Sequence, residues 1–246
     1  MSDTAAASEF GPLYLLPTPL GPGTPRDVLP EGVLARVRSL RYFIAERPRS
    51  ARAFLRSVDF PCPLTQVRIA TLDEHTPDEA LPELLAPLAG AAGALLSEAG
   101  APGVADPGAA LVRLAHARGI RVAPLVGPSA ILLALMAAGL NGQHFAFHGY
   151  LPIEAQALAR RVRELEAESR RLGQTQVFIE TPYRNDRLLE VLLRECRPAT
   201  RIAIASDLTL ASESIGVREV AAWRRAAPRI GKRPAVFLLL ALAEGR

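Results

Sequence analysis

The chain has 246 residues, of which 49% are hydrophobic and 22% charged, so it can bury the core of one large domain or two small ones. The sequence has no uninterrupted apolar segment long enough to favour a membrane span. The formal net charge is +4, but every basic residue except Lys232 is arginine. Such a bias indicates a general preference for arginine over lysine, so the charge is weak evidence for RNA binding.

Cysteine usage and the first residues indicate the compartment. Cys62 and Cys196 are far apart and lack metal-ligand spacing, so we expect free thiols in a reducing compartment and no bound metal. Residues 1–8 lack the basic and apolar regions of a signal peptide. We therefore expect a cytoplasmic protein without membrane contact, in which residues 1–10 form a disordered tail.

The chain begins with short apolar strands that alternate with helices. Strands are predicted over 13–16 and 42–45, and helices over 27–38 and 51–58, with Ser50 as the cap of the second helix. The proline- and glycine-rich loop 17–25 lacks the G-x-G-x-x-G spacing and the P-loop lysine, so it is not a nucleotide fingerprint.

Arginine is concentrated in one segment of this first part of the chain. Two interpretations of the segment remain open, a solvated helix face and a surface for an anionic substrate. The residues concerned are Arg36, Arg38, Arg41, Arg47, Arg49, Arg52 and Arg56.

A third strand is predicted over 66–72, followed by a helix that reaches about residue 89. Thr76 fits the N-cap of this helix, Pro77 its first position and Glu79 the third position of a capping box. His75 stays outside this pattern. A lone histidine before a helix is more often structural than catalytic, and both roles stay open.

The segment 97–108 organises the first half of the chain. It follows the apolar strand 93–97 and precedes the helix 109–118, so it is a glycine- and proline-rich connection at the carboxyl end of a strand. In an open α/β sheet that position faces a ligand crevice. The segment also contains the carboxylates Glu98 and Asp106. A ligand loop and a structural connection with an N-cap near Asp106 are both compatible with this pattern.

A further strand, 120–125, leads into Gly127-Pro128-Ser129-Ala130 and an apolar helix over 131–138. Ser129 lies where free N–H groups attract a carboxylate or polar ligand, or it is simply the N-cap. The alternation of strands and helices up to this point favours a largely parallel sheet.

The pattern changes after this point. Domains are predicted over 11–125 and 126–246. The second domain is expected to contain helices over 154–172, 186–195 and 220–225, and strands over 145–152, 177–180, 201–206, 214–217 and 234–241.

Seven short motifs along the chain resemble those of a known family. Each motif alone is weak, and their shared order and spacing make the resemblance specific. They are residues 18–21 (TPLG), 97–102 (SEAGAP) with 106–108 (DPG), 127–130 (GPSA), 149–152 (GYLP), 180–184 (ETPYR), 207–213 (DLTLASE) and 231–232 (GK). Together they resemble the tetrapyrrole-methylase superfamily of S-adenosylmethionine-dependent methyltransferases. The similarity is closest to the group that methylates a ribose 2′-hydroxyl of small-subunit ribosomal RNA.

The resemblance implies an α/β protein of two α/β domains, the first with a mostly parallel sheet and the second with a mixed sheet. It also implies a cofactor cleft between the domains, S-adenosyl-L-methionine as the cofactor, a homodimer, and RNA of the small ribosomal subunit as a partner. The cofactor-binding residues that it implies are Pro19, Gly21, Ser97, Glu98, Gly100, Pro102, Asp106, Pro107, Gly108, Ser129, Ala130, Thr181, Tyr183, Ala211 and Pro234.

The loops expected on the substrate side depart from the family pattern. The group shows A-E-D-T-R where this chain has Ala45-Glu46-Arg47-Pro48-Arg49, and a segment of the kind H-x-H-N-E where it retains only His75. Glu46, Arg49 and His75 are the expected catalytic residues. Three hypotheses follow: a methyltransferase acting on RNA, one acting on a tetrapyrrole or other small molecule, and a non-catalytic scaffold that binds the cofactor.

Overall fold

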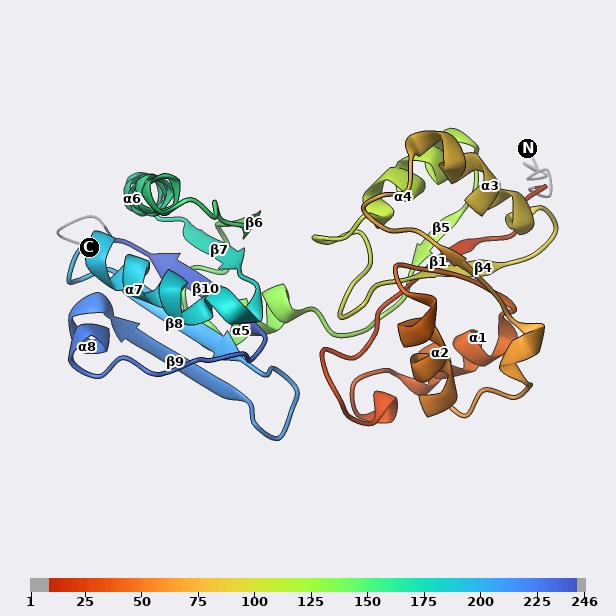
Figure 1. The fold of residues 1–246 in the computed structure, drawn as a ribbon, viewed down its shortest axis with the longest axis horizontal. Coiled ribbons are helices and arrows are strands. Elements are labelled where there is room, and N and C mark those ends of the chain that lie inside the picture. The colour runs from red at the N-terminus through yellow and green to blue at the C-terminus, as the bar shows by residue number, and fades with distance from the viewer. Residues whose placement is uncertain (1–8, 243–246) are drawn as a thin grey trace, which may run out of the picture. The chain divides into compact units, whose positions relative to one another are not determined.

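The computed structural model describes residues 9–242 (Figure 1), which form two compact units divided between Ser129 and Ala130. Residues 1–8 of the predicted disordered tail lie outside the described part. Residues 9 and 10 have defined structure, since Phe10 forms an antiparallel bridge with Ala89 and the Glu9 carbonyl accepts a hydrogen bond from the Gly90 N–H.

The first unit is built on a parallel sheet, as predicted. Its strand order is β3-β2-β4-β1-β5, and every neighbouring pair is parallel. Because β2 and β4 are buried along their whole length, they consist of continuous apolar residues. The strands are β1 (Leu13–Leu16), β2 (Tyr42–Ala45), β3 (Arg68–Thr71), β4 (Gly93–Leu96) and β5 (Val122–Pro124).

Helices cover both faces of this sheet. Figure 1 shows α1 and α2 on one side and α3 and α4 on the other. Alternate strand residues face the two layers, so Phe43 packs in the core beneath α1 and α2 and Ile44 in the core beneath α3 and α4. The helices are α1 (Glu31–Ser39), α2 (Pro48–Ser57), α3 (Leu81–Leu85) and α4 (Gly108–Ala117).

Three predicted helix starts were wrong, and two of the reasons involve proline. The first helix begins at Glu31, directly after Pro30, and only a short 3₁₀ turn, Pro25–Asp27, covers the region before it. The second helix begins at Pro48, because proline suits the first helical position. Ser50 therefore lies inside the first turn and does not cap the helix.

The predicted capping box at Thr76 was also wrong. The Thr76 hydroxyl donates a hydrogen bond of 2.9 Å to the Asp73 carboxylate and accepts one from the Asp73 N–H. The segment that follows is a 3₁₀ turn, Asp78–Ala80, without a side-chain cap. Local bonding to Asp73 has therefore replaced the helix cap.

The second unit contains a mixed sheet, as predicted. Its strand order is β6-β7-β10-β8-β9, with β6 and β7 parallel and the other neighbouring pairs antiparallel. The strands are β6 (Phe145–Tyr150), β7 (Thr175–Ile179), β8 (Arg201–Ser206), β9 (Ser214–Glu219) and β10 (Ala235–Leu240).

The core of the second unit lies between this sheet and three helices. Phe178 of β7 and Phe237 of β10 stack with ring centroids 6.1 Å apart, in a cluster with α6, α7 and α8. The helix α5 contacts β8, β9 and β10. No helix within residues 9–242 is long and apolar enough to cross a membrane. The helices are α5 (Ala130–Ala138), α6 (Ala155–Leu172), α7 (Asn185–Glu195) and α8 (Val220–Arg225).

Candidate functional site

The candidate site lies where the first sheet reverses its winding. The chain passes from β1 to β2 and β3 through α1 and α2 on one face, and returns to β4 and β5 through α3 and α4 on the other. Because β4 lies between β1 and β2, the helix after β4 covers one face of the sheet, and the helices after its neighbours β1 and β2 cover the other. Ligands of open α/β sheets bind outside the carboxyl ends of the strands at such a point.

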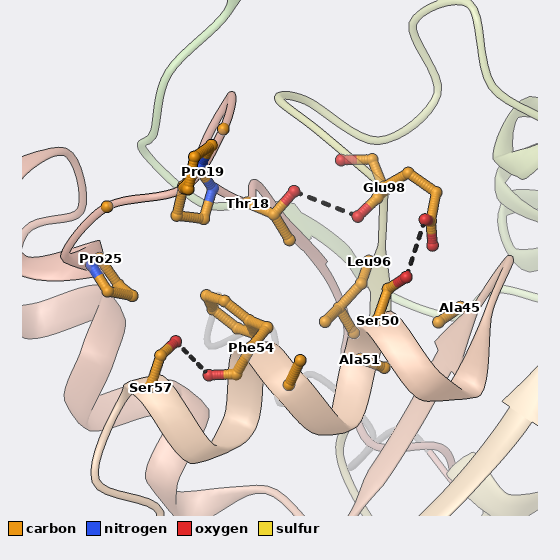
Figure 2. Close-up of a pocket in the computed structure, with 15 residues that line it drawn as sticks. Thr18, Pro19, Pro25, Ala45, Ser50, Ala51, Phe54, Ser57, Leu96 and Glu98 are labelled. Carbon is orange, nitrogen blue, oxygen red and sulfur yellow. Dashed lines mark hydrogen bonds between the residues drawn. The ribbon is translucent and has the colours of Figure 1, made fainter. Parts of the chain in front are cut away.

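A cavity of about 250 Å³ opens at these carboxyl ends (Figure 2). We call it the switch-point cavity. Its walls are the loop after β1, the end of β4 and one face of α2. The structure brings together here four of the predicted cofactor residues, namely Pro19, Gly21, Ser97 and Glu98.

One wall of the cavity was missed by the sequence analysis. Ser50, Ala53, Phe54 and Ser57 of α2 line it at helical spacing. Ala53, Phe54 and Ser57 share a face in the predicted helix 51–58 as well, and Ser50 joins them because the helix begins at Pro48, so the proline was the signal that could have revealed Ser50.

Hydrogen bonds join the loops that follow β1 and β4. Thr18 and Gly100 exchange two backbone hydrogen bonds of 3.0 Å, and the Thr18 hydroxyl donates one of 3.1 Å to the Ser97 carbonyl. The Ser97 hydroxyl in turn donates to the Gly100 carbonyl. Gly100 adopts a φ of +77°, which side chains rarely take, so glycine is needed to close this connection. The two loops therefore form one preorganised edge.

Asp106 shapes the rest of the segment between β4 and α4. Its Oδ1 accepts hydrogen bonds from the Gly103 N–H at 2.8 Å and from the Gly108 N–H at 2.7 Å. Gly108 must lack a side chain, because a Cβ there would lie 2.6 Å from Leu95 Cδ2. Burial raises the pKa of Asp106, against the lowering effect of the two N–H donors. Pro107 precedes α4 directly, and Pro102 is buried in the same segment.

The carboxyl ends of β2 and β4 place acidic side chains close to one another. Burial raises the pKa of Glu46, and the carboxylate of Glu98 raises it further. Asp106 contributes in the same direction, while Arg47 lowers the value. The Ser50 hydroxyl donates a hydrogen bond of 2.9 Å to Glu98, which Figure 2 marks with a dashed line. A cation beside these carboxylates would relieve their mutual repulsion.

The predicted catalytic residues differ in their surroundings. Glu46 is partly buried directly after β2, and Arg49 is exposed in the first turn of α2. The side chain of His75 is 84% exposed and lies 3.6 Å from Glu74. The structure does not bring His75 into the switch-point cavity.

The loop after β5 reaches the same edge of the first unit. Gly127 packs so closely that a Cβ there would lie 2.5 Å from Pro17. The Pro128 carbonyl lies against Gly100, because a Cβ added to Gly100 would be 3.6 Å from its oxygen. Ser129 ends this loop, and Ala130 is the first residue of α5. Gly127 and Pro128 therefore pack beside the loops after β1 and β4.

The other predicted cofactor residues lie in the second unit, at one edge of its sheet. Thr181 and Tyr183 follow β7, Ala211 follows β8 and Pro234 precedes β10. Because β10 is antiparallel to both β7 and β8, the start of β10 meets the ends of the other two strands. These residues therefore belong to neighbouring loops.

Lys232, which belongs to the motif at 231–232, also lies on this edge. Lys232 Nζ lies 5.0 Å from the centroid of the Tyr183 ring, which is 79% exposed. The Asp186 carboxylate accepts hydrogen bonds from the Ile230 and Gly231 N–H groups, and the Asn185 amide donates to the Arg233 carbonyl at 2.7 Å. This loop is therefore held in one conformation.

Comparisons with known proteins identify the family. The sequence model of the tetrapyrrole (corrin/porphyrin) methylases matches residues 19–222. Ribosomal RNA small subunit methyltransferase I of Escherichia coli O157:H7 is 32% identical over 89% of this chain and 74% of its own length. The protein of that name from Pseudomonas aeruginosa is 34% identical over 83% of this chain and 69% of its own length.

Solved structures show the same fold. The methyltransferase CobJ aligns with a TM-score of 0.61 and 23% identity over 94% of each chain. Uroporphyrin-III C-methyl transferase from Thermus thermophilus, complexed with S-adenyl homocysteine, aligns with a TM-score of 0.54 and 16% identity over 94% of this chain and 97% of its own. The chain belongs to the tetrapyrrole (corrin/porphyrin) methylase family, which confirms the predicted resemblance. It is an S-adenosylmethionine-dependent methyltransferase.

The residues at the switch point fit this cofactor. S-adenosylmethionine supplies a methyl group on a cationic sulfonium, and Glu46, Glu98 and Asp106 give this edge the opposite charge. Gly103, with φ +79°, leaves open space where a side chain would stand, so its backbone is accessible to a ligand. Within residues 9–242, no group of His, Cys, Asp and Glu side chains could hold a metal ion.

Proposed function

We propose that this enzyme methylates a ribose 2′-hydroxyl of small-subunit ribosomal RNA. The observation that carries the proposal is the similarity, over more than four fifths of the chain, to curated relatives named as ribosomal RNA small subunit methyltransferase I. The 2′-hydroxyl follows from the motif resemblance to that group. The proposal takes precedence over a tetrapyrrole acceptor because the solved tetrapyrrole enzymes are more distant, at 23% identity or less.

Methyl transfer requires the attacking oxygen, the methyl carbon and the sulfur to be aligned. The protein therefore contributes mainly by positioning its two substrates. A ribose hydroxyl must also lose its proton, so a base assists the reaction. We assign that role to Glu46, whose partly buried carboxylate has a raised pKa and stands beside the switch-point cavity. Arg49 would hold the acceptor nearby, and His75 is the alternative base.

The proposed donor-binding residues form two groups, one in each unit. Those of the first unit share the edge formed by the loops after β1, β4 and β5. Those of the second unit share the edge beside the start of β10. The first group comprises Pro19, Gly21, Ser97, Glu98, Gly100, Pro102, Asp106, Pro107, Gly108 and Ser129. The second comprises Thr181, Tyr183, Ala211 and Pro234, and Ala130, the first residue of α5, is proposed from the family resemblance alone.

Assembly and compartment belong to the same proposal. We expect a cytoplasmic homodimer, as the family resemblance implies. Analytical ultracentrifugation of the full chain tests the assembly, since a monomer at all concentrations would contradict it.

The test of the proposed function uses the purified full chain and radiolabelled S-adenosylmethionine. The acceptors are small ribosomal subunits from a strain that lacks the enzyme and, in parallel, uroporphyrinogen III. Label is expected in the RNA and not in the tetrapyrrole. Label in the tetrapyrrole alone would overturn the proposed substrate. Subunits from the parent strain, which already carry the methyl group, serve as the control and should accept no label.

A further inference from the structure

The arginines between residues 36 and 56 fall into two groups in the structure. Four of the seven interact with neighbouring groups of the protein. Arg36 stacks on Tyr14 and Arg41 on Phe60, Arg38 pairs with Glu31, and Arg47 lies 4.0 Å from Glu46. The other three are Arg49, Arg52 and Arg56, all on α2.

These three arginines, which we call the arginine stripe, share one face of α2. Their spacing of three and four residues places them in a row that spans about 10 Å along the helix axis. All three are exposed. Among the residues that the structure describes, none accepts a hydrogen bond from the stripe or forms an ion pair with it.

The stripe has no acidic partner on its own helix, and only Arg56, in the last turn, lies where the helix dipole favours a cation. No residue of α2 is acidic, and Arg49 stands in the first turn, where the helix dipole disfavours a cation. The arginines of α6 are different, because Arg160 and Arg170 pair with glutamates one turn away and Arg163 pairs with Glu195. The arginines named on α6 thus have acidic partners, whereas those of the stripe have none within the described part of the chain and are available to an anion outside the protein.

The stripe borders the switch-point cavity. On the helix surface, its row lies next to the row of Ser50, Ala53 and Ser57, which line the cavity together with Phe54. A polyanion held along the stripe could therefore extend a unit toward the mouth of the cavity. Arginine suits such a ligand, because its guanidinium matches phosphate oxygens in a bidentate fashion.

We infer that the arginine stripe binds consecutive phosphates of single-stranded RNA and directs the acceptor nucleotide toward the cofactor edge at the mouth of the switch-point cavity. This inference rests on the proposed function, since it names the surface by which the same RNA is held. A single strand suits this surface because its unstacked nucleotides can be splayed out from the backbone, whereas duplex RNA displays its 2′-hydroxyls in the shallow minor groove.

The test compares two double variants that change the net charge equally. Arg52→Gln with Arg56→Gln removes two members of the stripe and leaves Arg49 intact. Arg113→Gln with Arg118→Gln removes two exposed arginines, one from α4 and one from its C-cap, on the opposite face of the same sheet (Figure 1). The measurements are the affinity for small-subunit RNA between 50 and 200 mM salt, the KM and kcat of methylation, and the affinity for S-adenosylmethionine.

The stripe variant is expected to lose about 1.4 from the slope of log affinity against log salt, at about 0.7 per phosphate contact. Its KM for RNA should rise at least tenfold, with kcat and cofactor affinity unchanged. The α4 variant should match the wild type. Wild-type slope and KM in the stripe variant, in an enzyme that methylates RNA, would overturn the inference alone. Absence of RNA methylation by the wild type would overturn the proposed function, whatever the slope.

Discussion

The Thr18 hydroxyl donates a hydrogen bond of 3.1 Å to the carbonyl of Ser97, a residue 79 positions later in the sequence. Thr18 follows β1 and Ser97 follows β4, so this bond fixes the two loops at the point where the sheet reverses its winding. Both residues are buried. The pair therefore links the fold of the first unit to the geometry of the cofactor edge.

Replacing Thr18 by valine tests this link. Thr18→Val keeps the side-chain shape but leaves the Ser97 carbonyl without its donor, which should cost about 1–3 kcal/mol of unfolding free energy. Affinity for S-adenosylmethionine should also fall. Urea unfolding and calorimetry measure the two effects. Thr24→Val is the matched control, because Thr24 is exposed in the same loop. Equal stability of the two variants would contradict the role of this bond.

Asp106 has two separable roles, one in shaping its loop and one in supplying charge. Asp106→Asn retains an oxygen for the Gly103 and Gly108 N–H groups and removes the charge. The variant should unfold at the same temperature as the wild type and bind S-adenosylmethionine about tenfold more weakly, a loss of about 1.4 kcal/mol. Asp106→Ala should be destabilised as well, by about 3 kcal/mol.

Unchanged cofactor affinity in Asp106→Asn would mean that Asp106 only shapes the loop. A charge-reversing Asp106→Arg would be a poor test, because it also removes the acceptor of both N–H groups.

Glu46 predicts a pH dependence. Burial and the Glu98 carboxylate raise the pKa of Glu46, so the protonated form persists to higher pH than in an exposed glutamate. A base must be deprotonated, so the methylation rate should rise with pH through this raised pKa. In Glu46→Gln the rise of the rate with pH should disappear and kcat should fall at least a hundredfold, while cofactor affinity stays within a few-fold of the wild type. His75→Gln should keep both the rise with pH and the wild-type kcat. Loss of both in His75→Gln, with both kept in Glu46→Gln, would assign the base to His75.

The same raised pKa has a consequence for stability. Folding disfavours the ionised form of Glu46, so the contribution of this residue to stability declines as pH rises through the window between its unfolded and folded pKa values. Glu46→Gln should therefore be more stable than the wild type at neutral pH, and the difference should diminish in acid. Chemical unfolding at several pH values measures it, and a difference independent of pH would contradict the assignment of the shift.

Tyr183 offers a test of the second unit. Its exposed ring lies beneath the Lys232 ammonium, and Asn185 and Asp186 hold the loop that carries this lysine. Tyr183→Phe keeps the ring and should bind S-adenosylmethionine as the wild type does. Tyr183→Ala should bind it about tenfold more weakly. Calorimetry distinguishes them, and equal affinity in both variants would remove Tyr183 from the cofactor site.

Several elements could be predicted closely from the sequence. The strands at 42–45 and 201–206 and the helix at 220–225 have the predicted bounds, because each is a short apolar or amphipathic run. The start of α2 could not be placed by side-chain type alone. Ser50 is a good cap, yet Pro48 fits the first helical position better and shifts the helix by three residues.

The candidate site was predictable where a short motif forms it, and less so elsewhere. The loops at Thr18, Ser97 and Asp106 are continuous segments with recognisable glycines. The position of Phe54 in the same cavity as the loops after β1 and β4 depends on how α2 packs on the sheet, and the contact of Lys232 with Tyr183 depends on the antiparallel pairing of β10 with β7. Pairing between distant strands has no local sequence signal.

The most direct test of the central claim is nucleoside analysis of ribosomal RNA after reaction with the purified enzyme. Small subunits from a strain lacking the enzyme are incubated with S-adenosylmethionine, and their RNA is digested and analysed by mass spectrometry. The wild-type enzyme should produce one 2′-O-methylated nucleoside per subunit, and Glu46→Gln should produce none at matched times. RNA without new ribose methylation, from an enzyme that binds S-adenosylmethionine, would contradict the claim.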